Sequence, residues 1–550
     1  MKTYLILSLL IGFGILQAAM PAEWSEFQRD IGIQAAQFRD SEEHQIHRQQ
    51  RETRSYAVGD TETFWRWNLA VMPPTWFQTP ATCRAVGEHC YVFVADDQWN
   101  VHMTQANVDT IMVRLEQNTP NNPAIGAIEM DINLFGPIPD ELDNDPKLIV
   151  FYSALGSFQG TSFDGYFSPY NQVTEAQAQQ MNPPGHSNEC EMIYMTCYPL
   201  SPVAPIRLSV LAHELQHLIH WGQDANEETW LNEGCSELAM VAYGIPDPIT
   251  GFPSNPDNSL TAWNQQFADY VKVMLFFTYL HEQYGANDFI RNLVADPLNG
   301  MNSLINRFGI QYPEVAVNEV IHRWSIANVV DSPQPGDGIY NYVSLDLPNF
   351  FMTNMNAYPT LSNQPVSSYA TDYLTYTLPE GTAEFHIVCN YSHYVSMLLF
   401  NAANECTEVI NNGVGSFDGT IPPGTHRAVF VITNVAPTTM GYYYSIASTG
   451  TEDYTGAESL TAIAGSHPNP FARNTKVSYS LEKAGKVSVK IYNTKGQLVR
   501  CLLEESKSAG SHEINWYGDS DGGEPLGSGI YLVKLISGGN IRTAKILLQR

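Results

Sequence analysis

The residues best suited to chemistry lie in LAHELQHLIHWGQDANEETWLNEGCSE, residues 211–237. His213, Glu214 and His217 spell HExxH. On an α-helix, residues four apart share one face, one turn apart, so two such imidazoles can bind one metal ion. Zinc prefers nitrogen and oxygen ligands, and it lowers the pKa of a bound water to about 7. The pattern therefore predicts zinc at the two histidines, with Glu214 as general base for attack on a carbonyl.

A third ligand is needed, and Glu233 is the favoured candidate. It follows His217 by sixteen residues, in WLNEG at the start of the next expected helix, so a turn can return it to the histidines. Glu237, one turn later, could orient a histidine. His220 lies roughly 10 Å along the helix from His213, which suits an outer role better than direct ligation. Three other glutamates compete for the third position: Glu227, Glu228 and Glu237.

Two further sets of residues are candidates for supporting roles. Amide hydrolysis needs a donor for the developing oxyanion, and the following helices offer three residues that also fit packed core positions: Tyr270, Tyr243 and His281. The segment 130–147 is acidic and could bind Ca²⁺, although its spacing matches no EF-hand loop and an acidic surface loop is the alternative. Its acids are Asp131, Asp140, Glu141, Asp143 and Asp145.

The elements that must position this chemistry are helices. Apolar residues recur at three- to four-residue spacing after Pro205, which predicts a helix over 205–221. Further helices are predicted over 229–244 and 265–285, each closed by a glycine, and over 314–330. Residues 145–156 read as a buried strand, and 56–132 as mixed α+β material. The helical region therefore forms the centre of a domain spanning 56–345.

The chain changes character after residue 345. Short β-rich runs separated by Gly, Pro and Asn predict a β-sandwich over 346–450. A polar linker over 451–466 precedes a last β-rich block, 467–550. Residues 461–550 hold 12 Lys/Arg and 7 Asp/Glu, whereas the preceding 460 residues hold 16 and 50. This shift in charge supports a domain boundary near 460.

The N-terminus has the features of a secretory signal peptide. Lys2 precedes an apolar run over residues 4–16, and small residues follow, which predicts a signal peptide over 1–19. Residues 20–55 are polar and charged, and form an N-terminal arm or a propeptide whose removal could activate the protein. The apolar run is shorter than the ~20 residues of a membrane-spanning helix, and no later segment is long and apolar enough. We therefore expect no transmembrane span in the mature chain.

Composition limits the partners. The 550 residues are 44% hydrophobic, so large cores are available, and the formal net charge of −29 argues against nucleic acid as a partner. Eight cysteines in an exported chain make disulfides feasible. The spacing suggests three local pairs, with buried thiols as the alternative: Cys83–Cys90, Cys190–Cys197 and Cys389–Cys406.

HELQH followed by WLNEG resembles the gluzincin metallopeptidases, in which the glutamate of NEG is the third zinc ligand. The wider text resembles the hyicolysin-like family of secreted bacterial metallopeptidases, with GYFS at 165–168 and SNE-EM-Y at 187–194. The resemblance covers about residues 56–345. It implies His213, His217 and Glu233 as zinc ligands and Glu214 as general base. Aminopeptidase gluzincins have a longer gap before NEG, so exopeptidase activity is not implied.

The tail resembles the C-terminal sorting domain of type IX secretion substrates. The matching segments are PNPF (468–471), IYNTKGQLV (491–499), SGIYLVKL (528–535) and the closing AKILLQR. This resemblance implies the outer-membrane type IX secretion machinery as a partner, and a secreted or cell-surface bacterial protein. An ordinary Ig-like accessory module is the alternative.

Together these features predict a multidomain chain: an α+β zincin-like metallopeptidase domain followed by two all-β, Ig-like sandwich domains. The expected activity is zinc-dependent endopeptidase hydrolysis of extracellular proteins, by a water that Glu214 activates. Two alternatives remain open from the sequence: a surface binding or adhesion protein on a peptidase scaffold, and a zinc hydrolase of non-peptide amides.

Overall fold

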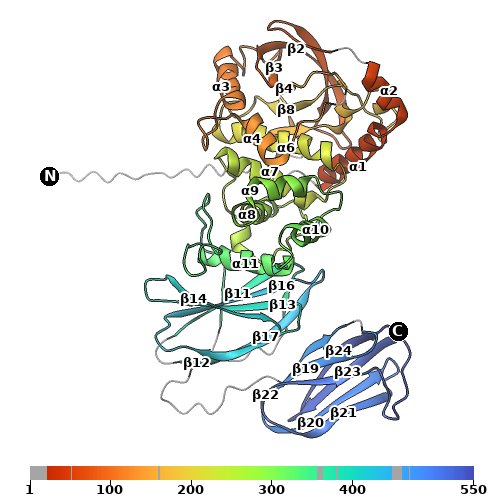
Figure 1. Ribbon diagram of the computed structural model, residues 1–550, viewed down its shortest axis with the longest axis vertical. Helices are drawn as coiled ribbons and strands as arrows, with labels where there is room; N and C mark the ends of the chain where they lie inside the picture. Colours follow the sequence, from red (N-terminus) through yellow and green to blue (C-terminus); the bar gives the residue numbers. More distant parts are fainter. Residues whose placement is uncertain are drawn as a thin grey trace, which may run out of the picture. The chain divides into compact units, whose positions relative to one another are not determined.

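The computed structural model describes residues 22–50, 53–140, 142–158, 161–355, 363–378, 382–448, 461–469 and 471–550. The predicted signal peptide and most of the predicted linker lie outside these residues. The chain forms two compact units, 1–250 with 263–303, and 251–262 with 304–550 (Figure 1). The division differs from the predicted boundary at 345, because the helix over 317–330 belongs with the sandwich that follows it.

The first unit is a mixed α/β domain built on one six-stranded sheet of order β1-β2-β3-β4-β8-β7. Strands β3, β4 and β8 run parallel, whereas β1, β2 and β7 pair antiparallel to their neighbours. The sheet strands are β1 (Thr61–Asn68), β2 (Thr75–Val86), β3 (Cys90–Ala95), β4 (Leu148–Ser153), β7 (Gly165–Phe167) and β8 (Met192–Thr196). A small hairpin joins β5 (Ser157–Phe158) and β6 (Thr161–Ser162).

Helices complete this unit. They are α1 (Ala22–Arg39), α2 (Glu42–Gln50), α3 (Gln105–Glu116), α4 (Ala127–Phe135), α5 (Glu175–Ala178), α6 (Pro205–Gln223), α7 (Thr229–Tyr243), α8 (Phe267–Gln283) and α9 (Ala286–Val294), with a 3₁₀ turn η1 (Pro169–Gln172). The predicted helices over 205–221, 229–244 and 265–285 are found as α6, α7 and α8. Helix α7 ends where predicted, because Gly244 takes φ +102° and its N–H caps the carbonyls of Met240 and Val241.

The N-terminal arm is built into this unit. Trp24 of α1 is fully buried and packs against the rings of Trp67, Phe158 and Phe163. At the other end of α1, the Arg39 guanidinium lies 4.9 Å from the centre of the Trp221 ring. The described part of the arm is therefore a structural element of the first unit.

The second unit contains two β-sandwiches. One stacks the sheets β10-β17-β12-β15 and β14-β13-β16-β11-β9, whose side chains share one core. The other stacks β18-β19-β22 and β21-β20-β23-β24 around a separate core. The chain is thus a multidomain α/β protein with several β-sandwich sheets, in agreement with the coarse prediction.

The bounds of these elements follow in chain order. The helices are η2 (Phe252–Ser254) and α11 (Val317–Val330), and α10 (Met301–Gln311) crosses the boundary between the units. The first sandwich has β9 (Thr353–Asn354), β10 (Gln364–Val366), β11 (Ala370–Thr377), β12 (Ala383–Val388), β13 (His393–Phe400), β14 (Cys406–Val414), β15 (Phe417–Ile421), β16 (Arg427–Asn434) and β17 (Met440–Ser448). The second has β18 (Ala462–His467), β19 (Thr475–Leu481), β20 (Gly485–Asn493), β21 (Leu498–Lys507), β22 (Gly510–Trp516), β23 (Gly529–Ser537) and β24 (Asn540–Leu548).

The predicted disulfides are wrong, because all eight cysteines are free. Cys190 and Cys197 flank β8, and seven extended residues span about 23 Å, far beyond the ~7 Å limit between bridged Cα atoms. Cys83 lies opposite Phe93 in the β2–β3 pairing, out of register with Cys90. Cys406 pairs with Phe400, whereas Cys389 follows β12 of the other sheet. Export permits disulfides, but these backbones do not bring the sulfurs together.

Among the described residues, the structure contains no helix that is long and apolar enough to cross a membrane.

Candidate metal centre

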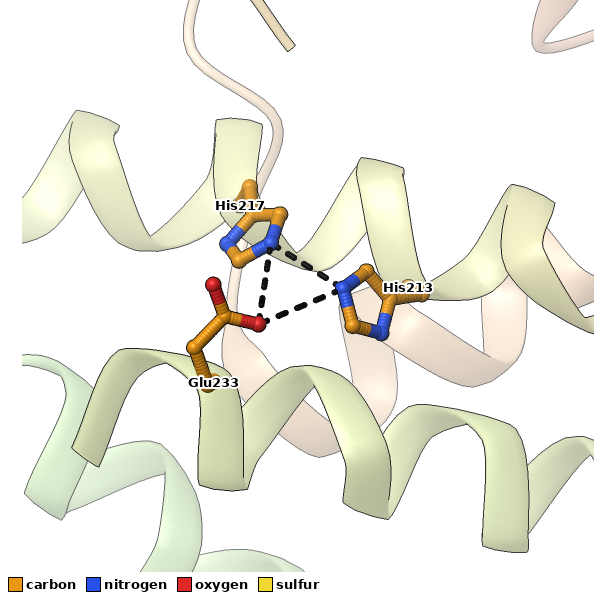
Figure 2. A group of neighbouring side chains, drawn as sticks. All are labelled: His213, His217 and Glu233. Carbon is orange, nitrogen blue, oxygen red and sulfur yellow. Dashed lines mark hydrogen bonds and ion pairs between the residues drawn. The ribbon is translucent and has the colours of Figure 1, made fainter. Parts of the chain in front are cut away.

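Helices α6 and α7 carry the candidate centre. Pro205 at the first turn needs no N–H partner, so α6 begins there, and its buried apolar side chains pack it beneath β7 and β8. Only residues 224–228 separate α6 from α7, and the two helices pack side by side (Figure 2). The short connection places Glu233, in the second turn of α7, opposite the HExxH turns of α6.

Figure 2 shows His213, His217 and Glu233 pointing toward one another. The two Nε2 atoms are 3.2 Å apart. Glu233 Oε2 lies 3.5 Å from Nε2 of His213 and 3.8 Å from Nε2 of His217. Zinc ligands about 2.0–2.1 Å from a tetrahedral ion are about 3.3 Å apart, so these separations suit an ion at the centre.

The chemistry of the three donors also fits a metal ion. Glu233 is 7% exposed, and its Oε2 accepts no hydrogen bond of good geometry from the described part of the chain. A buried carboxylate oxygen without such a partner is costly unless a cation binds it. Two imidazoles and one carboxylate leave a fourth tetrahedral position for a water or a substrate atom.

Neighbouring side chains hold the imidazoles through their other ring nitrogen. His217 Nδ1 lies 2.5 Å from Asn232 Oδ1 and 3.1 Å from Ser236 Oγ. His213 Nδ1 lies 3.4 Å from Glu237 Oε1. The contact with Asn232 Oδ1 favours a proton on Nδ1 of His217, which leaves its Nε2 lone pair for a metal, while Glu237 faces Nδ1 of His213. Glu237 therefore lies where an orienting carboxylate was predicted.

Glu214 lies beside this group on α6. It is 7% exposed, and burial raises its pKa to about 7, against the opposing charge of His213. Its carboxylate accepts a hydrogen bond from the backbone of Phe167 in β7. The close approach of β7 requires a glycine, since a Cβ on Gly165 would lie 2.8 Å from Glu214 Cγ. The sheet edge therefore fixes the position of this carboxylate.

The charges inside the centre are strongly coupled. Burial opposes the charge on His213, but Glu233 and Glu237 outweigh it and raise its pKa well above the usual value. Burial lowers the pKa of His217 to about 4. The histidines lower the pKa of Glu233 despite its burial. A charged Glu233 and a neutral His217 are the forms that bind a metal ion, whereas His213 is protonated in the metal-free centre and would release a proton on binding the ion.

The competing residues lie elsewhere. Glu227 accepts a hydrogen bond from the backbone N–H of Gly300, and Glu228 accepts one from Trp230 Nε1. His220 reaches the centre only indirectly, since its Nδ1 accepts from Gln216 Nε2, and Gln216 Oε1 accepts from Ser236 Oγ. Geometry therefore favours Glu233 over the other glutamates and leaves His220 an outer position.

The three candidate oxyanion donors make other contacts. Tyr243 ends α7, about 15 Å along the helix from Glu233. His281 Nε2 lies 2.9 Å from Asn287 Oδ1 at an exposed position. The Tyr270 ring packs edge-on against Trp263, 4.8 Å between centres. The contacts of these three residues do not identify an oxyanion donor among them.

The acidic segment divides in a way that the sequence did not suggest. Asp140 and Asp143 converge with Glu191, with their oxygen atoms within 4.8 Å of one another. Asp131 lies buried in α4, and Asp145 accepts a hydrogen bond from the Tyr91 hydroxyl. The fifth acid, Glu141, lies outside the described residues. Only two of the five predicted Ca²⁺ ligands therefore lie together in the described structure.

Asn232, Ser236 and Gly165 were missed as contributors to the centre. Asn232 precedes the candidate ligand Glu233, and Ser236 lies one turn after Asn232, so helical spacing could have placed both beside His217. Gly165 lies in the GYFS segment, but its contact with Glu214 spans 49 residues and depends on how the sheet packs on α6. Local spacing cannot predict such a contact.

Comparison with known proteins identifies one domain. Residues 471–539 match the family model of the FlgD Ig-like domain, within the block predicted over 467–550. The C-terminal sandwich is therefore an Ig-like domain. No curated protein sequence matches the chain.

Three solved structures share limited similarity. PorZ of Porphyromonas gingivalis, a surface component of its type IX secretion system, is 20% identical over 22% of this chain and 15% of its own, with TM-score 0.13. Latent PorU from the same organism is 16% identical over 34% of this chain and 20% of its own, with TM-score 0.19. A GH2 β-galacturonidase from Eisenbergiella tayi is 12% identical over 32% of this chain and 35% of its own, with TM-score 0.17. The chain thus spans at most about a third of their lengths, and the TM-scores are too low to show a shared overall fold.

Proposed function

We propose that this chain is a secreted, zinc-dependent endopeptidase of the gluzincin type. One observation carries the proposal: two imidazole nitrogens and one buried carboxylate oxygen converge at 3.2, 3.5 and 3.8 Å, with a general-base candidate beside them. Among the described residues, only one other cluster of side chains could hold a metal ion. It consists of carboxylates alone: Asp140, Asp143 and Glu191. Nitrogen donors are what distinguish a zinc site from a site for a hard cation such as Ca²⁺.

A zinc ion bound by His213, His217 and Glu233 would supply Lewis-acid polarisation of the substrate carbonyl and of water. The other steps belong to the protein's own side chains. Glu214 has a pKa of about 7 through burial, so near neutral pH it can take a proton from the attacking water and return it to the leaving nitrogen. Asn232 and Glu237 face Nδ1 of His217 and of His213 and would orient the two imidazoles.

The sheet edge offers a place for the peptide. Strand β7 is the last strand of its sheet among the described residues, and it lies against α6, which carries two of the three candidate ligands. An extended peptide can pair with such an edge through its backbone, which positions it without demanding a particular sequence. Proximity of this edge to Glu214 favours an endopeptidase, because backbone pairing with an edge strand needs no free peptide end.

We also propose that the Ig-like domain at the C-terminus is a type IX secretion signal. The support is the sequence resemblance of the tail, together with the folded sandwich over 461–550. Fusion of residues 461–550 to a periplasmic reporter in a bacterium with this secretion system should move the reporter outside the cell. Retention of the reporter in the periplasm would contradict this role.

The peptidase proposal is tested with the purified full chain. We expect one zinc per chain by elemental analysis and cleavage of casein that a chelator stops and added zinc restores. Zinc binding with hydrolysis of small amides alone would favour the non-peptide hydrolase. A folded chain that binds no zinc would contradict the enzyme and favour the surface binding protein.

A further inference from the structure

A hollow of about 80 Å³ opens beside the metal ligands. His217, Asn232 and Glu233 form one side of it, and Phe167 and Trp221 contribute apolar walls. Helix α1 closes part of its mouth, where Gln28 Nε2 donates to the backbone carbonyl of Phe167 at 3.2 Å. The hollow can hold several waters or the end of one long side chain. It is therefore placed to receive a substrate side chain next to the scissile bond.

Two buried carboxyl groups line the hollow. Asp224, which ends α6, is 8% exposed and lines it, and Oδ2 of this carboxyl has no hydrogen-bond partner in the described chain. Its Oδ1 accepts only a long bond, 3.4 Å, from the N–H of Asn226. Glu227, 4% exposed, also lines the hollow, but burial raises its pKa to about 8 and its Oε1 accepts the backbone N–H of Gly300, so Asp224 is the carboxylate available to a ligand. Buried carboxylates gain most from a cation that arrives with its own hydrogen-bond donors.

One cation already lies at the mouth of the hollow, on α1. The Arg29 side chain is exposed, lines the hollow, and reaches the backbone carbonyl of Asn226 at 3.4 Å. Its charge favours ionised Asp224, although burial raises the pKa of this carboxyl to about 6. The Arg29 guanidinium thus lies close enough to Asp224 to act on its charge, but it reaches the Asn226 carbonyl and makes no hydrogen bond to Oδ2 of Asp224.

We propose that this hollow selects a basic residue of the peptide substrate, with the Asp224 carboxylate as acceptor and Arg29 as a resident competitor at the mouth. The inference deepens the proposed peptidase function and rests on it. Asp224 is a specificity-determining residue on this reading, because it lies beyond the metal ligands and would contact the substrate side chain alone. Its charge would favour lysine or arginine over an apolar residue of equal length.

The test measures binding without turnover. Full-length Glu214→Gln protein loaded with zinc is titrated calorimetrically with two blocked pentapeptides that differ only in a central arginine or norleucine. We expect the arginine peptide to bind about tenfold more tightly or better, as for a charge-assisted hydrogen bond. Adding Asp224→Asn should remove this ratio, and adding Arg29→Ala should increase it. Asp109→Asn, an exposed carboxyl on α3, should leave it as it was.

Opposite effects of the two variants separate a specificity role from a structural one. Equal affinity for both peptides, or a preference that survives Asp224→Asn, would overturn the inference. The same peptides are then offered to the wild-type chain for hydrolysis. Preference in binding with no cleavage would contradict the peptidase and leave the basic pocket standing, whereas cleavage of both peptides at equal rates would contradict the pocket alone.

Discussion

The buried histidines of two regions of this molecule differ in the partners of their ring nitrogens. His322 of α11 is 4% exposed, and hydroxyls satisfy both its nitrogens: Thr433 at 2.8 Å from Nδ1 and Ser396 at 2.7 Å from Nε2. In α6, His217 Nδ1 lies 2.5 Å from Asn232 Oδ1 and His213 Nδ1 lies 3.4 Å from the Glu237 carboxylate, while their Nε2 atoms meet each other and Glu233. Burial of a histidine therefore does not indicate a metal site, whereas convergence of incompletely paired donors does.

The largest expected effect separates catalysis from packing at the candidate metal centre of α6 and α7. Glu214→Gln should lower the rate of casein cleavage by about 10²–10⁴, because it removes the base and keeps the shape. Zinc content should not change, since Glu214 is not among the three converging ligands. The matched control is Glu319→Gln on α11, a half-exposed carboxyl paired with Arg323, which should cleave at the wild-type rate. Equal loss in both variants would contradict the assignment.

A second substitution removes a hydrogen-bond partner of His217 and leaves all three candidate ligands in place. Asn232→Ala removes the oxygen 2.5 Å from Nδ1 and should weaken zinc affinity by about 10–100-fold, as loss of an orienting group does elsewhere. Competition with a coloured chelator measures it. Asn287→Ala removes a comparable oxygen from the exposed His281 and serves as control. Unchanged zinc affinity in Asn232→Ala would mean that the contact with α7 does not orient the His217 imidazole.

A third change acts on the contact between the sheet edge and the base. Gly165→Ala would place a Cβ 2.8 Å from Glu214 Cγ and 2.9 Å from Met195 Sδ, so we expect about 1–3 kcal/mol of destabilisation and slower cleavage with zinc retained. Thermal unfolding and kcat report the two effects. At Gly309 in α10 an added Cβ meets nothing within 4 Å, so Gly309→Ala should not destabilise the chain. Normal stability in Gly165→Ala would show that the edge strand can move away.

The smallest expected effect concerns pH and the buried His322 of α11. Burial lowers the pKa of His322 to about 3, below its unfolded value of about 6.5. Its contribution to stability is therefore present above about pH 6.5 and is lost as the pH falls toward 3. His322→Gln should make the acid-induced fall in unfolding free energy shallower over this window, as measured by urea unfolding at several pH values. Parallel curves for the two proteins would contradict this explanation.

Helical periodicity was enough to bring the three candidate ligands together, since His213, His217 and Glu233 lie on two helices read directly from the sequence. Periodicity did not reveal α3, whose apolar residues were read as part of a mixed α+β region. The capping box formed by Thr104 and Asn107 is the sequence feature that marks the start of this helix. The two β-sandwiches were predicted from short β-rich runs that turn residues separate.

Other features depend on distant segments and were not predictable. The burial of α1 beside α6 requires Trp24 to reach Trp67, Phe158 and Phe163 across the unit. The free cysteines depend on strand register, which sequence spacing does not set. The hollow at Asp224 is likewise a product of packing between α1 and the α6–α7 connection.

The short connection between α6 and α7 has a consequence for the order of assembly. The three ligands and their orienting side chains fall within residues 213–237, so little loop-closure entropy opposes their meeting. Contacts of such low sequence separation form early in folding. Glu214 reaches Phe167 and Gly165 only after the distant sheet edge has docked. In the proposed peptidase, the metal ligands would therefore be close in space at a lower entropic cost than the contact that positions the base.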